Sequence, residues 1–180
     1  MTNHENLTMH REKVRISDKN MLKEILGRCE VLNLGLHDEP YPYTVAMNYG
    51  FEWDDKLIFY GHMAIEGHRI ELIRKNPLVS VSVFEFLDRC GYRPYRNETH
   101  DYRSVHAYGK ASVITPEQRE EYIHGFSLLN NNCARPAIKE ITDEMRKRLF
   151  VLKIECDFVT GKAQYPISSV EEVPIPENTK

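Results

Sequence analysis

Apolar and polar residues alternate along several short segments of this 180-residue chain. The clearest case is "YRSVHAYGKASVI" at 102–114, where every second residue from Val105 to Val113 is apolar or glycine. Alternation with a period of two is the pattern of a strand that has one face on a core and the other face exposed. Because other segments repeat this pattern, the sequence favours a mainly β fold.

Five further strands are expected. The region 31–60 predicts a three-strand meander, with turns at Asp38-Glu39-Pro40 and at Asp54-Asp55. A fourth strand is expected in "LVSVSVFEF" (78–86), the fifth is 102–114, and the last is expected in "FVLKIECDFV" (150–159). Six strands with few crossovers predict a closed or nearly closed antiparallel barrel of the mainly β (α+β) class.

A few short helices should accompany the barrel. Four segments combine helical spacing of apolar residues with start or stop signals: 17–27, 66–75, 115–129 and 138–149. Ser17 or Asp18 can cap the first helix, and the pair Asn76-Pro77 stops the second. Thr115 and Gln118 have the spacing of a capping box, so we expect the third helix to begin there.

Composition sets the class of protein. The hydrophobic share of 41% is enough for a core, and the length suits a single domain covering 1–180, with its core at about 15–163 and flexible ends. The 24 basic and 27 acidic residues contain no basic block that would follow a phosphate backbone, which argues against nucleic acid. No apolar run is long enough to span a bilayer and no signal-like segment starts the chain, so we expect no membrane partner and a cytoplasmic protein.

Metal-ligand patterns are missing from the sequence. The four cysteines lie far apart without a CxxC pair, which favours reduced thiols in or near the core. The eight histidines include no HExxH motif, and His62 and His68 lack the spacing that places two ligands on one helix face. We therefore expect no metal site.

One segment has the composition of an anion site. In "GHMAIEGHRIELIRKNP" (61–77) the end of a strand is followed by Gly67 and by Arg69 in the first turn of a helix. Backbone N–H groups at a helix start and a forked guanidinium both bind phosphate, and histidines can add donors. The alternative is that the glycine only ends the strand and that Arg69 pairs with Glu66 or Glu71 on a solvated face.

Four motifs together resemble the flavin-binding split-barrel proteins related to pyridoxamine 5'-phosphate oxidase, specifically their nitroimidazole-resistance (Nim-like) branch. The motifs are "PYTVAMNYGFE", "LIFYGHMAIEGHRIELIRKNPLVSVSV", "YRSVHAYGKASVI" and "VLKIECDFVTGKA", in the family's order. The resemblance runs from about Arg15 to Ala163. It implies a six-stranded antiparallel split barrel of the FMN-binding type that forms a homodimer with the flavin at the interface.

The resemblance also implies which residues bind the cofactor. Residues matching Val45–Tyr49 run along the isoalloxazine ring, largely through backbone groups, and residues matching His62, His68 and Arg69 lie by the phosphate and ribityl chain. Tyr102 and Ser104 lie where a second subunit contributes. The implied cofactor-binding residues are Val45, Ala46, Met47, Asn48, Tyr49, His62, Gly67, His68, Arg69, Tyr102 and Ser104.

The chain departs from the family pattern in two ways. A proline is common where this chain has Ala46, and the more distant oxidases present several arginines and a lysine to the phosphate where this chain has mainly Arg69 and histidines. The resemblance therefore implies FMN but leaves FAD open as the cofactor. Motifs for a pyridoxal substrate are not apparent, so oxidation of vitamin B6 is not expected.

The function implied by the resemblance is a flavin-dependent oxidoreductase. It would reduce a small-molecule acceptor, such as a nitro compound of the 5-nitroimidazole type, or have a related oxidase-like activity, with electrons from a nicotinamide or a redox partner protein. The flavin ring supplies the chemistry, so no catalytic side chain is named. Two alternatives remain: a non-catalytic flavin- or haem-binding module or sensor, with His62, His100 or His106 as axial ligand, and an inert dimer that shares only the fold.

Overall fold

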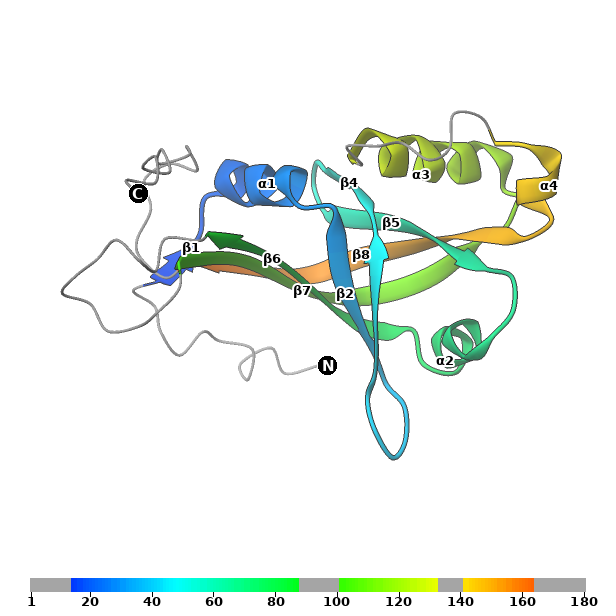
Figure 1. Cartoon of the computed structure of the whole chain (residues 1–180), viewed down its shortest axis with the longest axis horizontal. Helices are drawn as coiled ribbons and strands as arrows, with labels where there is room; N and C mark the ends of the chain where they lie inside the picture. Colours follow the sequence, from blue (N-terminus) through cyan, green and yellow to red (C-terminus); the bar gives the residue numbers. More distant parts are fainter. Residues whose placement is uncertain (1–13, 88–100, 133–140, 164–180) are drawn as a thin grey trace, which may run out of the picture.

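The computed structural model describes residues 14–87, 101–132 and 141–163, which form one curled sheet flanked by helices (Figure 1). His100 lies outside the described residues, as do both ends of the chain. The elements, in chain order, are β1 (Arg15–Ile16), α1 (Lys19–Arg28), β2 (Val31–Leu36), β3 (Tyr43–Asn48), β4 (Gly50–Trp53), β5 (Leu57–Ala64), α2 (His68–Lys75), β6 (Leu78–Leu87), β7 (Asp101–Ile114), α3 (Arg119–Asn132), α4 (Asp143–Arg146) and β8 (Leu149–Ala163).

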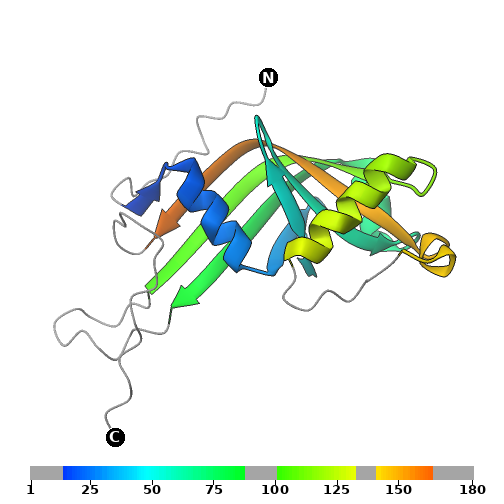
Figure 2. The ribbon, with the colours of Figure 1, turned by 90° about the horizontal axis from the view of Figure 1, so that it is seen from above.

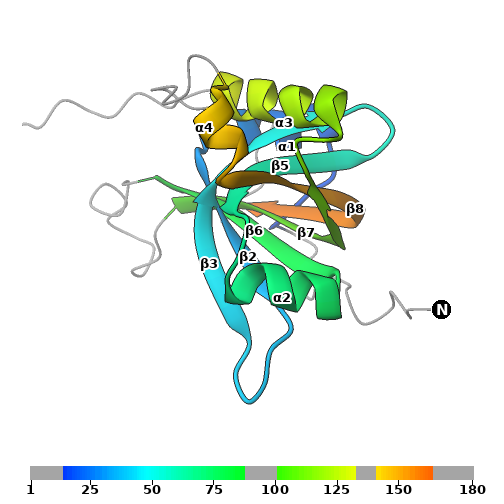
Figure 3. The same ribbon diagram turned by 90° about the vertical axis from the view of Figure 1, so that its right-hand side faces the viewer.

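The sheet is antiparallel throughout and is curled into a split barrel. Its strand order is β3-β2-β6-β7-β8-β5-β4, with β1 paired to the end of β8. The curl brings the β3 edge near β5 (Figure 3). At this seam a Cβ atom on Gly61 would overlap the Met47 side chain, so the glycine allows the close approach of the two strands. The predicted mainly β split barrel is confirmed.

The predicted number of six strands is wrong, because the described residues form eight. The region 31–60 holds four strands instead of a three-strand meander: β2 pairs with β3, and β4 pairs with β5, but β3 and β4 lie at opposite edges of the sheet. The chain crosses between the edges at Tyr49, which is fully buried. The remaining strand, β1, is only two residues long, too short to show an alternating pattern.

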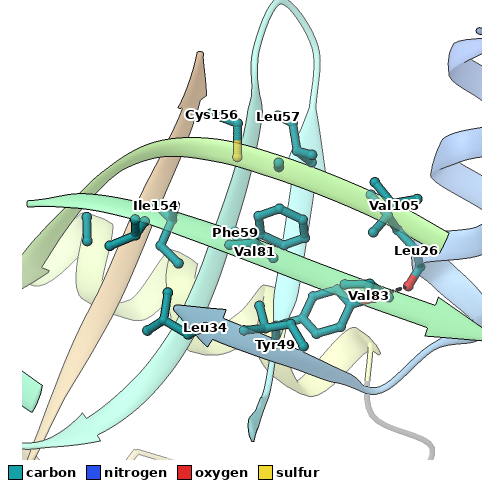
Figure 4. Close-up of a cluster of buried hydrophobic side chains, with 14 of the residues drawn as sticks. Leu26, Leu34, Tyr49, Leu57, Phe59, Val81, Val83, Val105, Ile154 and Cys156 are labelled. Atoms are coloured by element: carbon teal, nitrogen blue, oxygen red, sulfur yellow. Dashed lines mark hydrogen bonds between the residues drawn. The ribbon is translucent and has the colours of Figure 1, made fainter. Parts of the chain in front are cut away.

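Side chains fill the interior of the barrel. Leu34, Phe59 and Val83 have no exposed surface and meet Tyr49 in one cluster (Figure 4). The Tyr49 hydroxyl donates a hydrogen bond to the Leu26 carbonyl at 2.7 Å, which ties α1 to the strand crossing. A small barrel packed in this way leaves no room for a cofactor inside it, so a cofactor site must lie on the outside.

The cysteines in the described residues are structural. Cys29 and Cys156 are unpaired and buried, as expected from the sequence. Burial raises the pKa of the Cys29 thiol to about 11 and that of the Cys156 thiol to about 12. Both thiols are therefore protonated at neutral pH and are poor nucleophiles.

Helices α1 and α3 lie on the same side of the sheet (Figure 2). Asp18 caps α1 as expected, accepting the Met21 N–H at 2.9 Å, and the Thr115 N–H donates to the Gln118 side chain at 3.2 Å, half of the expected capping box. The helix predicted at 138–149 is wrong in extent, since within its described part only α4 is helical and β8 begins at Leu149. None of the described helices is long and apolar enough to cross a membrane.

Candidate anion and cofactor site

The start of α2 has an open N-terminus. Gly67 is the N-cap residue, with φ 117° and ψ 169°, a conformation that residues with a Cβ rarely adopt. Its carbonyl accepts from the N–H groups of Ile70 and Glu71 at 3.2 and 3.4 Å, and within the described residues no side chain caps the helix. The first N–H groups of α2 are therefore oriented for an external acceptor, which favours an anion. The helix begins two residues later than predicted.

A pocket of about 170 Å³ opens beside this helix start. Tyr43 of β3, Ala64 of β5 and the segment 66–70 line it. Pockets that enclose a whole ligand measure roughly 300 to 1,000 Å³. This pocket is thus large enough for one end of a cofactor, such as a phosphate, and the rest would lie along the outer surface.

Arg69 has no carboxylate partner among the described residues. Its Nη1 lies 3.7 Å from the Met47 sulfur, a weak contact, and no ion pair joins it to Glu66 or Glu71. The alternative interpretation, in which Arg69 pairs with Glu66 or Glu71, is therefore wrong. A half-buried guanidinium without a carboxylate retains its donors for a ligand anion.

His62 has one ring nitrogen that is buried. Its Nδ1 is shielded from solvent and has no hydrogen-bond partner in the part of the chain that the structure describes. The ring stacks on Phe126 of α3, with 6.5 Å between ring centroids. Burial, and then the charge of Arg69, lower the pKa of His62, so the imidazole is neutral at pH 7. A buried polar atom left unpaired is costly, and a ligand group that bonds to it would remove this cost.

His68 is held by a carboxylate that the sequence did not predict. Its Nε2 lies 2.7 Å from Oδ2 of Asp38, in the turn between β2 and β3, and the edge of the Tyr43 ring packs against it at 5.5 Å. The hydrogen bond with His68, and then the one from the Glu39 N–H, lower the pKa of Asp38. Asp38 lies 30 positions before His68, so no local spacing signals the contact.

The segment 45–49 lies beside these residues, and its side chains alternate between the core and the outer surface. Val45 and Met47 pack against the core, whereas Ala46 and Asn48 are exposed on the outer side of β3. Asn48 donates through Nδ2 to the Glu30 carbonyl at 3.0 Å. Tyr49 is fully buried in the core and its carbonyl accepts a hydrogen bond from Asn132 at 3.0 Å, so the structure does not present this residue to a cofactor.

Tyr102 and Ser104 lie elsewhere in the same chain. They pair with Phe86 and Phe84 on β6, whereas α2 joins β6 at its other end, near Leu78. Six residues of strand separate Leu78 from Phe84, a distance of about 20 Å. The structure thus brings 45–48, His62 and 67–69 together in one region, but not Tyr102 or Ser104.

A family model described as "Pyridoxamine 5'-phosphate oxidase" matches residues 18–163, most of the chain. The chain belongs to this family. No curated protein matches the sequence. The matched range contains the seam between β3 and β5, the start of α2 and the whole of β7, so the candidate site lies within the family region.

Solved structures share the fold at low sequence identity. A candidate 5-nitroimidazole antibiotic resistance protein from Bacteroides thetaiotaomicron is 24% identical, with TM-score 0.68, covering 87% of this chain and 95% of its own. An FAD and heme binding protein from Mycobacterium smegmatis is 16% identical, with TM-score 0.64, covering 88% and 77%. A flavocytochrome from Azotobacter vinelandii is 14% identical, with TM-score 0.64, covering 95% and 88%. At these identities the likeness concerns the fold alone.

Proposed function

We propose that this protein binds a flavin nucleotide, FMN or FAD, along the seam of β3, β5 and α2, and that it is a flavin-dependent oxidoreductase. The main support for this proposal is the environment of Arg69. This half-buried cation has no carboxylate partner among the described residues and lies beside the open start of α2. Membership of the pyridoxamine 5'-phosphate oxidase family and structural relatives named as FAD-binding or as a flavocytochrome support a flavin as the ligand.

The residues of this region fit the parts of such a ligand. The Arg69 guanidinium and the N–H groups at the start of α2 would bind the phosphate, and the unpaired Nδ1 of His62 would bond to the ribityl chain or phosphate. The exposed backbone face of β3 at 45–48 would line the ring. A bound flavin would supply hydride or electron transfer, while the protein supplies position and electrostatics.

The outer face of the sheet supports a homodimer. Three apolar side chains are exposed on it, Val31 at 46%, Phe84 at 59% and Tyr108 at 36%. The hydroxyls of Ser104 in β7 and Thr160 in the adjacent β8 are buried without a partner among the described residues. A second copy packed on this face would cover the apolar surface and would bring Tyr102 and Ser104 towards the flavin of the partner.

The dimer is testable by light scattering. Phe84→Glu should convert the dimer to monomer, because the exposed ring is replaced by a charge that must be desolvated in the interface. The matched control is Ile123→Glu, since Ile123 is also an exposed apolar residue, at 40%, but lies on α3. A monomeric unmodified protein that binds one flavin per chain would contradict the dimer.

The proposed reaction is reduction of a small acceptor such as a 5-nitroimidazole, with electrons from a nicotinamide or a redox protein. The Nim-like motifs and the fold shared with the Bacteroides thetaiotaomicron protein support this substrate class. The flavin-loaded protein should oxidise NADH or NADPH faster when a 5-nitroimidazole is present, with loss of the nitro absorbance. The reductase activity would be contradicted if the 5-nitroimidazole accelerated no oxidation of NADH or NADPH and if protein reduced beforehand with dithionite also failed to reduce the nitro group.

A second candidate is a flavin or haem carrier. His106 is half-buried on the outer face, and burial, followed by the charge of Lys162, lowers its pKa, so its imidazole is neutral and able to ligate iron. Relatives described as heme-binding or as a flavocytochrome share the fold. A Soret band that persists in the purified protein and disappears in His106→Ala would support this candidate.

A further inference from the structure

Asp38 holds a negative charge next to the pocket beside α2, in contact with His68, which lines that pocket. Its Oδ2 contacts Nε2 of His68 at 2.7 Å, and its Oδ1 accepts the backbone N–H of Glu39 at 2.9 Å. Both carboxylate oxygens are therefore held in place. The Asp38 side chain is only 23% exposed, while His68 at 54% remains open to the solvent side of the pocket.

Because of this pair, His68 adds no net positive charge to the site. If His68 is protonated, the charge of Asp38 cancels it, and if His68 is neutral, the carboxylate faces only the charge of Lys75, which lies in the last turn of α2 and outside the pocket lining. A second carboxylate, that of Glu66, lines the pocket itself. Against these, Arg69 is the one permanent cation among the described residues that line it, and His62 next to it is neutral.

This balance distinguishes two kinds of phosphate. A terminal phosphomonoester, as in FMN, carries between one and a half and two negative charges at pH 7, about as a phosphorylated side chain does. Each phosphorus of a pyrophosphate diester, as in FAD, carries only one charge. A single guanidinium with a helix start can compensate one charge, but a second charge would face Asp38 and Glu66 without a partner.

We propose that Asp38, through its ion pair with His68, makes the site select a flavin with a pyrophosphate diester over a flavin with a terminal phosphate. The inference rests on the proposed flavin site and names the chemical class of its ligand. Asp38 acts as a specificity-determining residue that repels charge, since it contributes no bond to the ligand. The nearby open start of α2 then binds one singly charged phosphate group.

The test is the ratio of dissociation constants for FMN and FAD, measured by flavin fluorescence in the ligand-free protein and in Asp38→Asn. Asparagine keeps the turn and can still bond to His68, so the variant should fold. The unmodified protein should bind FAD more tightly than FMN. Removing one charge near the ligand should change affinity by roughly fivefold for each ligand charge, so the ratio should shift towards FMN by about fivefold.

Asp157→Asn is the matched control. Asp157 forms a surface ion pair with Lys56 at 3.5 Å. Lys56 directly precedes β5, at the end of this strand that is far from α2, and Asp157→Asn changes the net charge by the same amount as Asp38→Asn. It should leave the ratio unchanged, and riboflavin, which lacks phosphate, should bind equally to all three proteins. Tighter binding of FMN than FAD by the unmodified protein, or an unchanged ratio in Asp38→Asn, would overturn this inference alone. Failure of all three flavins to bind would overturn the proposed function and this inference with it.

Discussion

Two polar regions, one beneath α3 and one at the start of α2, differ in how their charges are satisfied. Beneath α3, Glu52 accepts hydrogen bonds from the Tyr60 hydroxyl and from His124, both at 2.8 Å, and Lys153 pairs with Glu121 at 2.7 Å. At the start of α2, by contrast, Arg69 has no carboxylate partner among the described residues. The first arrangement fixes a helix to the sheet.

The second arrangement leaves binding capacity unused. Folding normally pairs buried polar groups, because each unpaired group costs free energy. Among the described residues, Arg69 has no carboxylate partner and Nδ1 of the nearby His62 has no hydrogen-bond partner, which is consistent with the proposed external ligand. This comparison indicates a structural role for the region beneath α3 and supports the proposal that the start of α2 binds the cofactor.

The largest expected effect is in the unpaired region. Arg69→Ala should weaken flavin binding by about 1.5 to 3 kcal/mol, roughly ten- to a hundredfold, through loss of a charge-assisted hydrogen bond. Arg74→Ala is the matched control, since Arg74 lies in the last turn of the same helix, where a cation interacts with the helix dipole. Titration of both ligand-free variants with flavin measures the two dissociation constants. Equal values would contradict the proposal that Arg69 binds the phosphate.

The next effect concerns the backbone that opens the helix. Gly67→Ala should lower the free energy of unfolding by about 1 to 3 kcal/mol, because φ 117° and ψ 169° strain any residue with a Cβ. Space is not the cause, as a Cβ here would meet no atom within 4 Å. Gly27→Ala is the control, being equally uncrowded but inside α1. Urea unfolding measures both, and equal stability of Gly67→Ala and the unmodified protein would show that the helix starts differently.

A smaller effect is expected beneath α3. Glu52→Gln should lower the free energy of unfolding by at most about 1 kcal/mol, since the pair with His124 is partly exposed, and should leave flavin affinity unchanged. A change in flavin affinity as large as that of Arg69→Ala would break the contrast between the two regions.

The pH dependence of Glu52 follows from its pKa. Burial acts to raise this pKa, but the hydrogen bonds from Tyr60 and His124 lower it overall, below the ordinary 4.5. A depressed folded-state pKa stabilises the protein at pH values above the unfolded pKa, and this stability is lost as the pH falls through the folded value. Unfolding curves between pH 6 and pH 3 should therefore converge for Glu52→Gln and the unmodified protein at the acid end.

The smallest effect concerns His62. Its pKa is lowered in the ligand-free protein, and a bound phosphate should raise it, so binding should take up part of a proton and should weaken as the pH rises through the bound-state pKa. Calorimetry in buffers of different ionisation enthalpy measures the uptake. If His62→Gln binds flavin with the same uptake and affinity, the histidine does not contact the ligand.

Local patterns predicted what local physics decides. The alternation in 102–114 predicted β7, and Asp18 caps α1, as its position before the helix predicts. Closure of the barrel could not be predicted in this way, because the chain crosses the core at Tyr49 and so places the consecutive strands β3 and β4 at opposite edges of the sheet. The three-strand meander predicted for 31–60 is wrong for that reason.

The site divides along the same line. Gly67 and Arg69 stand out in sequence because a glycine before a basic helix start is a local signal. Asp38 and Phe126 do not, since they reach His68 and His62 only through the folded sheet and α3. The resemblance to a family supplied Tyr102 and Ser104, and their distance from α2 within one chain makes their role depend on a second copy.

The most direct measurement of the central claim is the visible spectrum of the purified protein, followed by mass identification of the molecule that heat releases. The account predicts a yellow protein with the two-banded spectrum of a flavin, and a released mass equal to FAD or FMN, with one molecule per chain. A colourless protein that binds neither flavin when it is added would contradict the account.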